Sequence, residues 1–477
     1  MPEPEKSVNW TRRIGWTLVI LVIVLFTAHA LWTSIAASRL SRRITAIRDA
    51  GEPIDPKDFN HTILDSANNV GADILAAGKL IDPNTQPWKY FDDRQFTLPL
   101  SDQERQTLDA FVTANAAAVK RLDVSKGKTG LEWEIDYSQP LAWQNKFPEM
   151  AFARYIASAA AMQGLWEHEH GNDKAAIGRF DQLLLIGRFA DRHPTLVGHL
   201  VSINMDELAM HWMSRIAPEL KIGNGPNDVS PQDLRRIVDQ LTGDDEIRLN
   251  TLQAIRGERM MDLDVVRAML NGTPVPPAWS GLGTNLPGPL RYFARPVYLT
   301  TGSGIVQHMT STLDAAKENS WPAVKAKLPP IIITKSPINQ LQWSLTPSME
   351  RALLTHFEGL TDRHLTAVAL AVRTYALDHD GQFPAKLEDL VPTYISAVPV
   401  DPMRADHKPL GYRPDPKQPL TYSVGTDGID NGGSQADPSG RRKPLANQAP
   451  NEWYLNDRVL PLYRPAKPAP ATGQAGG

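Results

Sequence analysis

An uninterrupted apolar segment near the start of the chain is its strongest pattern. Residues 14–34 carry no charged side chain, and none occurs between Arg13 and Arg39. About 20 apolar residues, at a rise of ~1.5 Å each, cover the ~30 Å hydrocarbon layer of a bilayer as a helix. Trp16 and Trp32 lie near its two ends, where aromatic rings favour the membrane interface. The pattern predicts a transmembrane helix over residues 14–34.

Other interpretations of this segment stay open. The basic residues before it and Ala28-His29-Ala30 within it also fit a signal peptide cleaved after Ala30. Apolar and small residues continue to Ala37, which favours a retained helix. A buried core helix is disfavoured because no face of the segment carries a charge. Basic residues flank both ends, but long domains translocate regardless of such charges. We therefore expect the N-terminus inside and the bulk of the chain outside.

Helical spacing of apolar residues dominates the next two hundred positions. Leu40, Ile44 and Ile47 extend the first helix to Asp49, after which Gly51 ends it. Further on, the sequence predicts several capped or amphipathic helices. They are a helix opening at Ser101 with Glu104 as its capping-box partner, a helical hairpin over 150–190 that turns at Gly171-Asn172, and helices over 231–241 and 245–270.

Proline changes the pattern in the second half of the chain. Residues 271–346 are too rich in proline for continuous helices, so we expect short ones, such as 304–318, joined by extended segments; 328–334 is either an edge strand or a connector. A long helix is predicted from Pro347 to about His379, with Thr346 as its N-cap. Short strands are expected over 410–412, 420–424 and 453–455.

These elements predict a mainly α protein with a small α+β C-terminal module, in which a long helix packs on a short antiparallel sheet. The predicted order is a cytoplasmic N-terminus (1–13), the transmembrane helix (14–34), a stalk (35–59), an irregular helical domain (60–270), a Pro-rich connecting region with short helices (271–346), the α+β module (347–464) and a disordered tail (465–477).

Composition narrows the function only by exclusion. The formal net charge is −3, so no overall basic field exists to hold nucleic acid, and we expect none to bind. The absence of cysteine excludes disulfides, thiolate zinc sites and cysteine nucleophiles. No nucleophile elbow, phosphate-binding glycine loop or dinucleotide fingerprint occurs.

The C-terminal part resembles a known family. The matching features are the helix with Tyr375, the turn Gly381-Gln382-Phe383-Pro384, then Asp401-Pro402 and Tyr422-Ser-Val-Gly-Thr-Asp-Gly428. In this order they resemble the globular part of the major pseudopilin of type II secretion systems, over less than a fifth of the chain. Related tails occur in large membrane-anchored bacterial proteins. The start Gly15-Trp16-Thr17 is also similar to a pilin leader, but Ile20 replaces the glutamate that processing needs.

The resemblance implies a location and a candidate metal loop. It places the module on the outer side of a bacterial cytoplasmic membrane. That family often carries calcium after its Tyr-Ser-x-Gly strand, where Asp427 and the carbonyl of Val424 match ligands, while Asp430 and Asp437 lie nearby out of register. Calcium takes six to eight oxygen ligands, which carboxylates and carbonyls supply. The alternative is that Asp-Gly and Asn-Gly are ordinary turn formers.

Catalytic candidates are weaker. Five histidines cluster in the helical domain at His168, His170, His193, His199 and His211, but their spacing fits no metal-ligand motif. Asp244, Asp245 and Glu246 suit the start of the next helix. We therefore expect a single-pass, membrane-anchored extracytoplasmic protein that binds or assembles with protein partners, linked to a secretion or envelope complex. The alternative is an extracytoplasmic enzyme whose site lies in the helical domain.

Overall fold

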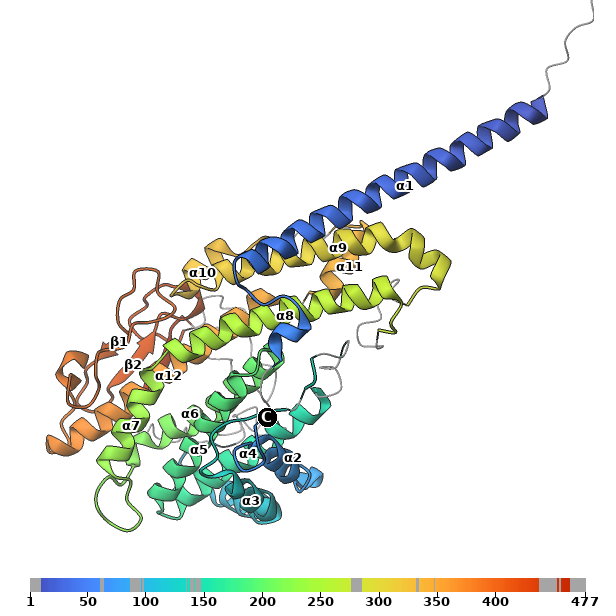
Figure 1. The fold of residues 1–477 in the computed structure, drawn as a ribbon. Helices are drawn as coiled ribbons and strands as arrows, with labels where there is room; N and C mark the ends of the chain where they lie inside the picture. Colours follow the sequence, from blue (N-terminus) through green and yellow to red (C-terminus); the bar gives the residue numbers. More distant parts are fainter. Residues whose placement is uncertain are drawn as a thin grey trace, which may run out of the picture.

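The computed structural model describes residues 10–60, 64–85, 96, 98–133, 135–137, 141, 147–275, 285–331, 334–346, 348–436, 453 and 456–463, with the backbone alone for 147–151. The fold is mainly helical, with a small antiparallel sheet near the C-terminus (Figure 1). Its helices are α1 (Trp10–Asp49), α2 (Gly71–Gly78), α3 (Asp102–Leu122), α4 (Phe147–Glu169), α5 (Asp173–Asp191), α6 (Leu196–Ile216), α7 (Pro231–Thr242), α8 (Asp245–Asn271), α9 (Gly288–Ala315), α10 (Trp321–Lys327), α11 (Pro337–Leu345) and α12 (Met349–Asp378).

The first helix has an isolated half and a packed half. The N-terminal half of α1 projects beyond the rest of the molecule, and its C-terminal half runs beside α9 (Figure 1). On the packed half, the less exposed positions recur every three or four residues: His29, Thr33, Ala36, Leu40, Arg43 and Ile47. Such spacing is a coiled-coil-like seam. Because His29 lies beside Phe293 and Arg43 beside Ser303, the two helices run parallel.

A second helix completes this layer. Helix α8 packs antiparallel to α9, since Gly272 at the end of α8 lies against Arg291 while Arg248 near its start bonds to Asn319. The residues that follow α1 are tied to α8 by three ion pairs: Glu52 with Arg259 at 2.9 Å and with Arg256 at 3.8 Å, and Asp55 with Arg267 at 2.5 Å. Helix α1 is therefore bonded to the body by side chains as well as by the chain itself.

Helices α2 to α6 surround a large apolar core. Ser101 caps α3 through the predicted capping box with Glu104. The predicted hairpin is formed by α4 and α5, with Gly171 at a φ of 76° and Asn172 capping α5 by accepting from the amide of Ala175. Glycine adopts this left-handed conformation without steric cost, which lets the chain reverse in two residues.

Helix α12 joins the helical domain to the sheet. It packs against α6 and α7 on one side and against β2 on another (Figure 1). The sheet has three antiparallel strands, with β2 in the centre: β1 (Gly411–Arg413), β2 (Leu420–Ser423) and β3 (Arg458–Pro461). In its register, Gly411 pairs with Tyr422 and Leu420 pairs with Pro461. Arg458 of β3 pairs with Asp362 of α12 at 3.0 Å.

Several sequence expectations need correction. The short helix expected over 304–318 is the C-terminal part of α9, which begins at Gly288 and contains Pro296, so proline density did not prevent a long helix. Thr346 ends α11, and Ser348 holds the N-cap position of α12. The third strand of the described sheet is β3, and of the strand expected over 453–455 only Trp453 lies in the described residues. No strand is assigned to the described part of 328–334, where 332 and 333 lie outside the description.

Candidate functional site

Four helices enclose a small polar cavity in the helical domain. The cavity measures about 50 Å³ and lies between α5, α6, α8 and the first half of α12. Its charged and titratable lining side chains are Arg188, Asp191, His199, Asp206, Glu246, His356 and Arg363. Charged side chains are rarely buried unless they are paired. Their convergence makes this cavity the candidate functional site.

A chain of hydrogen bonds crosses one wall of the cavity. Asp191 and His199 are bonded at 2.5 Å between Oδ1 and Nδ1. The hydroxyl of Thr251 lies 3.4 Å from His199 Nε2 and 3.1 Å from His356 Nδ1. An acid, an imidazole and a hydroxyl in this order form the geometry that activates a nucleophile in hydrolases. Whether these groups can act in that way depends on where the hydroxyl proton of Thr251 lies.

Thr251 has one proton and three neighbours that compete for it. Its hydroxyl donates to the carbonyl of Ile247 at 2.8 Å, as helical threonines commonly do. That bond uses its proton, so toward the two imidazoles the oxygen can act only as an acceptor, because a hydroxyl has one donor and two lone pairs. Burial, and after it the neighbouring His199, lowers the pKa of His356 well below its usual value. The arrangement fits a buried polar network, in which the hydroxyl has no spare proton for His199 to remove.

An ion pair forms the opposite wall. Arg363 on α12 donates to Asp206 on α6 at 2.7 Å and to the carbonyl of Gln240 at 2.6 Å. Burial raises the pKa of Asp206 to about 6, although Arg363 acts to lower it. Asp206 Oδ1 and Arg363 Nε have no hydrogen-bond partner within the described part of the chain. A polar cavity of this volume has room for ordered water, which needs about 10–15 Å³ and would supply both bonds.

Helix α8 carries a second group of buried acids. Glu258 and Asp262 lie one helical turn apart, at 5% and 0% relative exposure. Burial raises the pKa of Glu258 to about 7 and that of Asp262 well above its usual value. Both oxygens of Asp262 are without a hydrogen-bond partner in the described residues. Two adjacent buried carboxyls cannot both ionise cheaply, so at least one is protonated near neutral pH.

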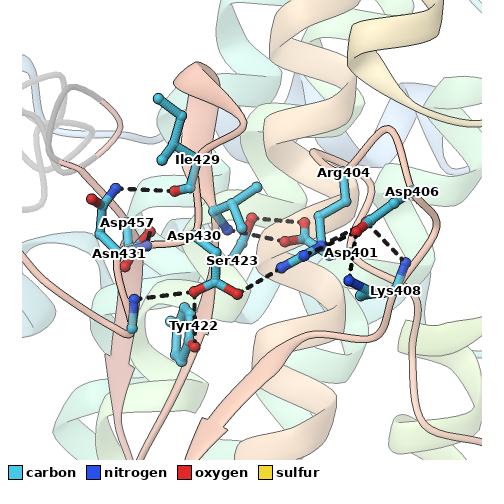
Figure 2. A network of polar contacts seen from close by, with 12 residues as sticks. Asp401, Arg404, Asp406, Lys408, Tyr422, Ser423, Ile429, Asp430, Asn431 and Asp457 are labelled. Atoms are coloured by element: carbon cyan, nitrogen blue, oxygen red, sulfur yellow. Dashed lines mark hydrogen bonds and ion pairs between the residues drawn. The ribbon is translucent and has the colours of Figure 1, made fainter.

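The C-terminal loop that sequence analysis marked for calcium has its own polar network. Figure 2 shows Asp430 between Tyr422 and Arg404, with one oxygen accepting from the tyrosine hydroxyl at 3.1 Å and the other paired to the guanidinium at 2.9 Å. Arg404 also holds Asp406 at 2.8 Å. Arg404 lowers the pKa of Asp430. A guanidinium thus already lies where Asp430 would meet a cation.

The other predicted calcium ligands are dispersed around this loop. Asp427 accepts from the amide of Ile429 at 2.9 Å, which is an ordinary Asx turn. The amide of Val424 donates to the buried carboxylate of Asp401 at 3.0 Å. Asp437 lies outside the described residues. In the described part of the chain, no group of three or more His, Asp or Glu side chains is placed to hold a metal ion. Calcium in the loop stays a prediction.

The clustered histidines separate in the fold. Only His199 reaches the cavity. His168 pairs with Asp173 at 2.5 Å, and His170 stacks on Trp166 with 4.0 Å between ring centroids. His193 lies near Tyr137, and His211 beside Arg215. Sequence proximity therefore did not identify the site, and the partner of His199 in the cavity, His356, comes from a distant helix.

Asp244 has a different role from the predicted one. It holds the N-cap position of α8, yet its side chain makes no capping hydrogen bond. Its carboxylate instead pairs with His364 of α12, at 3.0 Å and 3.1 Å from Nε2. Despite burial, the bond and charge of His364 lower the pKa of Asp244. Asp245 and Glu246 lie in the first turn of α8, as expected.

The signal that could have found the cavity lies in the helices themselves. His199 and Asp206 on α6, and His356 and Arg363 on α12, are polar residues at buried positions of helices whose other buried residues are mostly apolar. Polar residues at core positions of a helix predict a partner across the interface, though not which partner. Comparison of the chain with protein-family models, with curated proteins and with solved structures finds no match.

Proposed function

We propose that the protein is held in a bacterial cytoplasmic membrane by α1, exposes its bulk on the extracytoplasmic side, and acts there by binding or assembly in a secretion or envelope complex. One observation carries the anchoring. The most apolar stretch of α1 is long enough to cross a membrane and is wholly exposed, while its continuation packs against α9. An apolar surface of that size is stable in water only when covered, and a bilayer covers it.

Binding accounts for the body of the molecule better than catalysis does. The polar cavity of about 50 Å³ is far smaller than the ~300–1,000 Å³ of common ligand pockets. A second cavity, of about 280 Å³ beside Arg373 and Phe383, is close to that range but does not contain the charged cluster. Its charged side chains pair with one another across helices, as Arg363 does with Asp206. Such pairing supports a role in fixing α12 against α6 and α8. The resemblance of the α12 and sheet region to pseudopilins supports an outward-facing module that contacts other proteins.

The experiment is site-directed labelling in cells, which the cysteine-free chain permits. Ile429→Cys lies in the C-terminal loop at 60% exposure, and Ser7→Cys precedes the apolar segment. In intact spheroplasts, a membrane-impermeant maleimide is expected to label Ile429→Cys and to reach Ser7→Cys only after lysis. Both variants should fractionate with membranes. The reverse labelling overturns the orientation, and a soluble protein that begins after Ala30 overturns the anchor.

A second function has one observation in its favour. The order Asp191, His199, Thr251 is that of an acid, base and hydroxyl nucleophile. The test is labelling of the purified full chain by a fluorophosphonate probe, with Thr251→Val as the control and peptide mass spectrometry to locate the adduct. Modification of Thr251 that requires His199 would establish an enzyme. Absence of any adduct while the protein is folded supports the binding role.

A further inference from the structure

The first turns of α9 form an apolar surface outside α1. Leu290, Tyr292 and Phe293 are 56%, 50% and 52% exposed, although their side chains are large and apolar or aromatic. Leu290 and Phe293 are three residues apart and therefore share one face of the helix. Exposed apolar side chains that adjoin one another mark a contact with a partner or a membrane, whereas scattered ones need no explanation.

Contacts with α1 fix the depth of this surface relative to the predicted span. The ring of Phe293 lies 6.0 Å from that of Phe26 and 5.6 Å from that of His29, and the ring of Tyr292 lies 5.0 Å from His29. Phe26 precedes Trp32, which marks the end of the apolar segment, by six residues, or about 9 Å of helix rise. Interfacial helices bury their apolar face about 5–10 Å into the boundary between headgroups and acyl chains.

The charges around the surface are of one sign. In α9 no acidic residue occurs before Asp314, whereas Arg291 and Arg295 flank the aromatic pair. In the described part of α1, the first acidic residue is Asp49, and Arg39, Arg42 and Arg43 lie just beyond the apolar segment. Basic side chains near a bilayer favour anionic headgroups by about 1 kcal/mol each. Arginine and aromatic side chains together are the composition of a membrane-surface segment.

From this geometry we infer that residues 288–295 of α9 insert into the headgroup region of an anionic bilayer beside α1, as a second membrane contact of the protein. The inference rests on the proposed anchoring by α1. Two contacts at different positions fix the tilt and rotation of the body on the membrane, which a single helix leaves free. Because α9 packs on α1 and α8 packs on α9, the rest of the helical domain is held in the same orientation relative to the membrane.

The test uses nitroxide labels on single cysteines in the full chain, reconstituted in nanodiscs that contain phosphatidylglycerol and phosphatidylcholine. Leu290→Cys and Phe293→Cys report the proposed contact. Leu25→Cys, 59% exposed on α1, is the lipid reference. Leu249→Cys on α8 is the matched aqueous reference, since it is 62% exposed and lies some 33 Å along α8 from its end near Arg291. The readout is collision with oxygen, which favours lipid, relative to collision with a water-soluble nickel chelate.

The expected ratio of oxygen to nickel collisions at Leu290 and Phe293 is several-fold above that at Leu249 and below that at Leu25. It should fall when phosphatidylglycerol is omitted or when Arg291→Gln and Arg295→Gln are combined. If both sites match Leu249 while Leu25 reports lipid, the second contact is wrong and the anchor stands. If Leu25 also matches Leu249, the anchor is wrong and the inference falls with it.

Discussion

Arg363 on α12 and Asp206 on α6 form an ion pair of 2.7 Å whose side chains are only 6% and 12% exposed. The pair joins the helix that carries the C-terminal sheet to the middle of the helical domain. Both charged groups have lost most of their hydration, and the attraction between them offsets the free energy lost with that water. Arg363 is therefore one of the side chains that couple the two regions of the molecule, together with His364, which bonds to Asp244.

Arg363→Met should destabilise the protein by about 3–5 kcal/mol at pH 8, because it leaves a buried carboxylate without its partner. The loss should be smaller at pH 5. The folded-state pKa of Asp206, already about 6, rises further without Arg363, and a protonated carboxyl needs no counter-charge. Because this pKa lies above the unfolded value of about 3.9, the group favours folding at low pH and that contribution disappears as pH rises.

Chemical denaturation of the reconstituted protein at the two pH values measures this difference. Arg236→Met is the matched control, because Arg236 also pairs with an aspartate, Asp181 at 2.9 Å, but is 53% exposed. Exposed pairs contribute about 0–1 kcal/mol. Equal losses for the two arginines, or a larger loss for Arg363→Met at pH 5 than at pH 8, would show that the pair is not coupled in this way.

Glu258→Gln should flatten the dependence of stability on pH. Burial raises the folded-state pKa of Glu258 to about 7, above the unfolded value of about 4.3. The contribution of Glu258 to the free energy of unfolding of the wild type is therefore fully present below pH 4 and is lost as pH rises through 7. Glutamine keeps the shape and the acceptor for the amide of Leu196 but does not ionise. As pH rises from 5 to 8, the free energy of unfolding of the variant should increase relative to that of the wild type by on the order of a few kcal/mol.

Melting temperature against pH, in one lipid composition, is the measurement for Glu258. The exposed Glu350 on α12 provides the control substitution, Glu350→Gln, which should leave the wild-type curve unchanged. A wild-type melting temperature that rises steadily from pH 5 to pH 8, with no difference for Glu258→Gln, would contradict the raised pKa.

Local sequence signals predicted much of the helical structure. Ser101 with Glu104 marked the start of α3, and Gly171-Asn172 marked the turn between α4 and α5, because capping and left-handed turns depend on neighbouring residues alone. Only the C-terminal part of α9 follows from the sequence, because the proline density of 271–346 argues against a continuous helix there. A proline removes one helical hydrogen bond, and tertiary packing, here against α1 and α8, can outweigh that cost.

The candidate site could not be predicted in the same way. Its lining side chains come from α5, α6, α8 and α12, and the two partners Asp206 and Arg363 are separated by 157 positions. No local spacing encodes such a pairing. The five histidines that are close in sequence have separate partners, because His168 lies on α4, His199 and His211 lie in different turns of α6, and His170 and His193 lie in the connections between helices. The sequence does show polar residues among the apolar residues of these helices. Such residues indicate a buried partner but do not identify it.

Calcium should leave the melting temperature of the wild-type protein unchanged at millimolar concentration. The oxygens of Asp430 are already bonded to Arg404 and Tyr422, and the guanidinium repels a cation at that position. Differential scanning calorimetry in calcium and in chelator measures the effect. A rise in melting temperature with calcium that Asp427→Asn abolishes would instead establish the loop as a calcium site.

Glu52→Gln should weaken the attachment of the helical domain to α1. Arg259 on α8 is 1% exposed and pairs with Glu52 at 2.9 Å, just after α1 ends. Without that carboxylate, the buried guanidinium retains hydrogen bonds to the carbonyl of Pro53 at 3.1 Å and to Thr310 at 3.2 Å but no full counter-charge. We expect a loss of about 2 kcal/mol, below that of fully buried pairs, because Glu52 is 23% exposed.

Thermal unfolding in nanodiscs tests the attachment, with Asp49→Asn as the control, since Asp49 is an exposed acid three residues earlier. The control should melt with wild type. Because Asp55 still pairs with Arg267, Glu52→Gln should remain folded at low temperature but expose the connection after α1 to protease earlier on heating. If the two substitutions have equal effects, the Glu52 to Arg259 pair does not hold the domain on α1, and the Asp55 to Arg267 pair and the seam between α1 and α9 must do so.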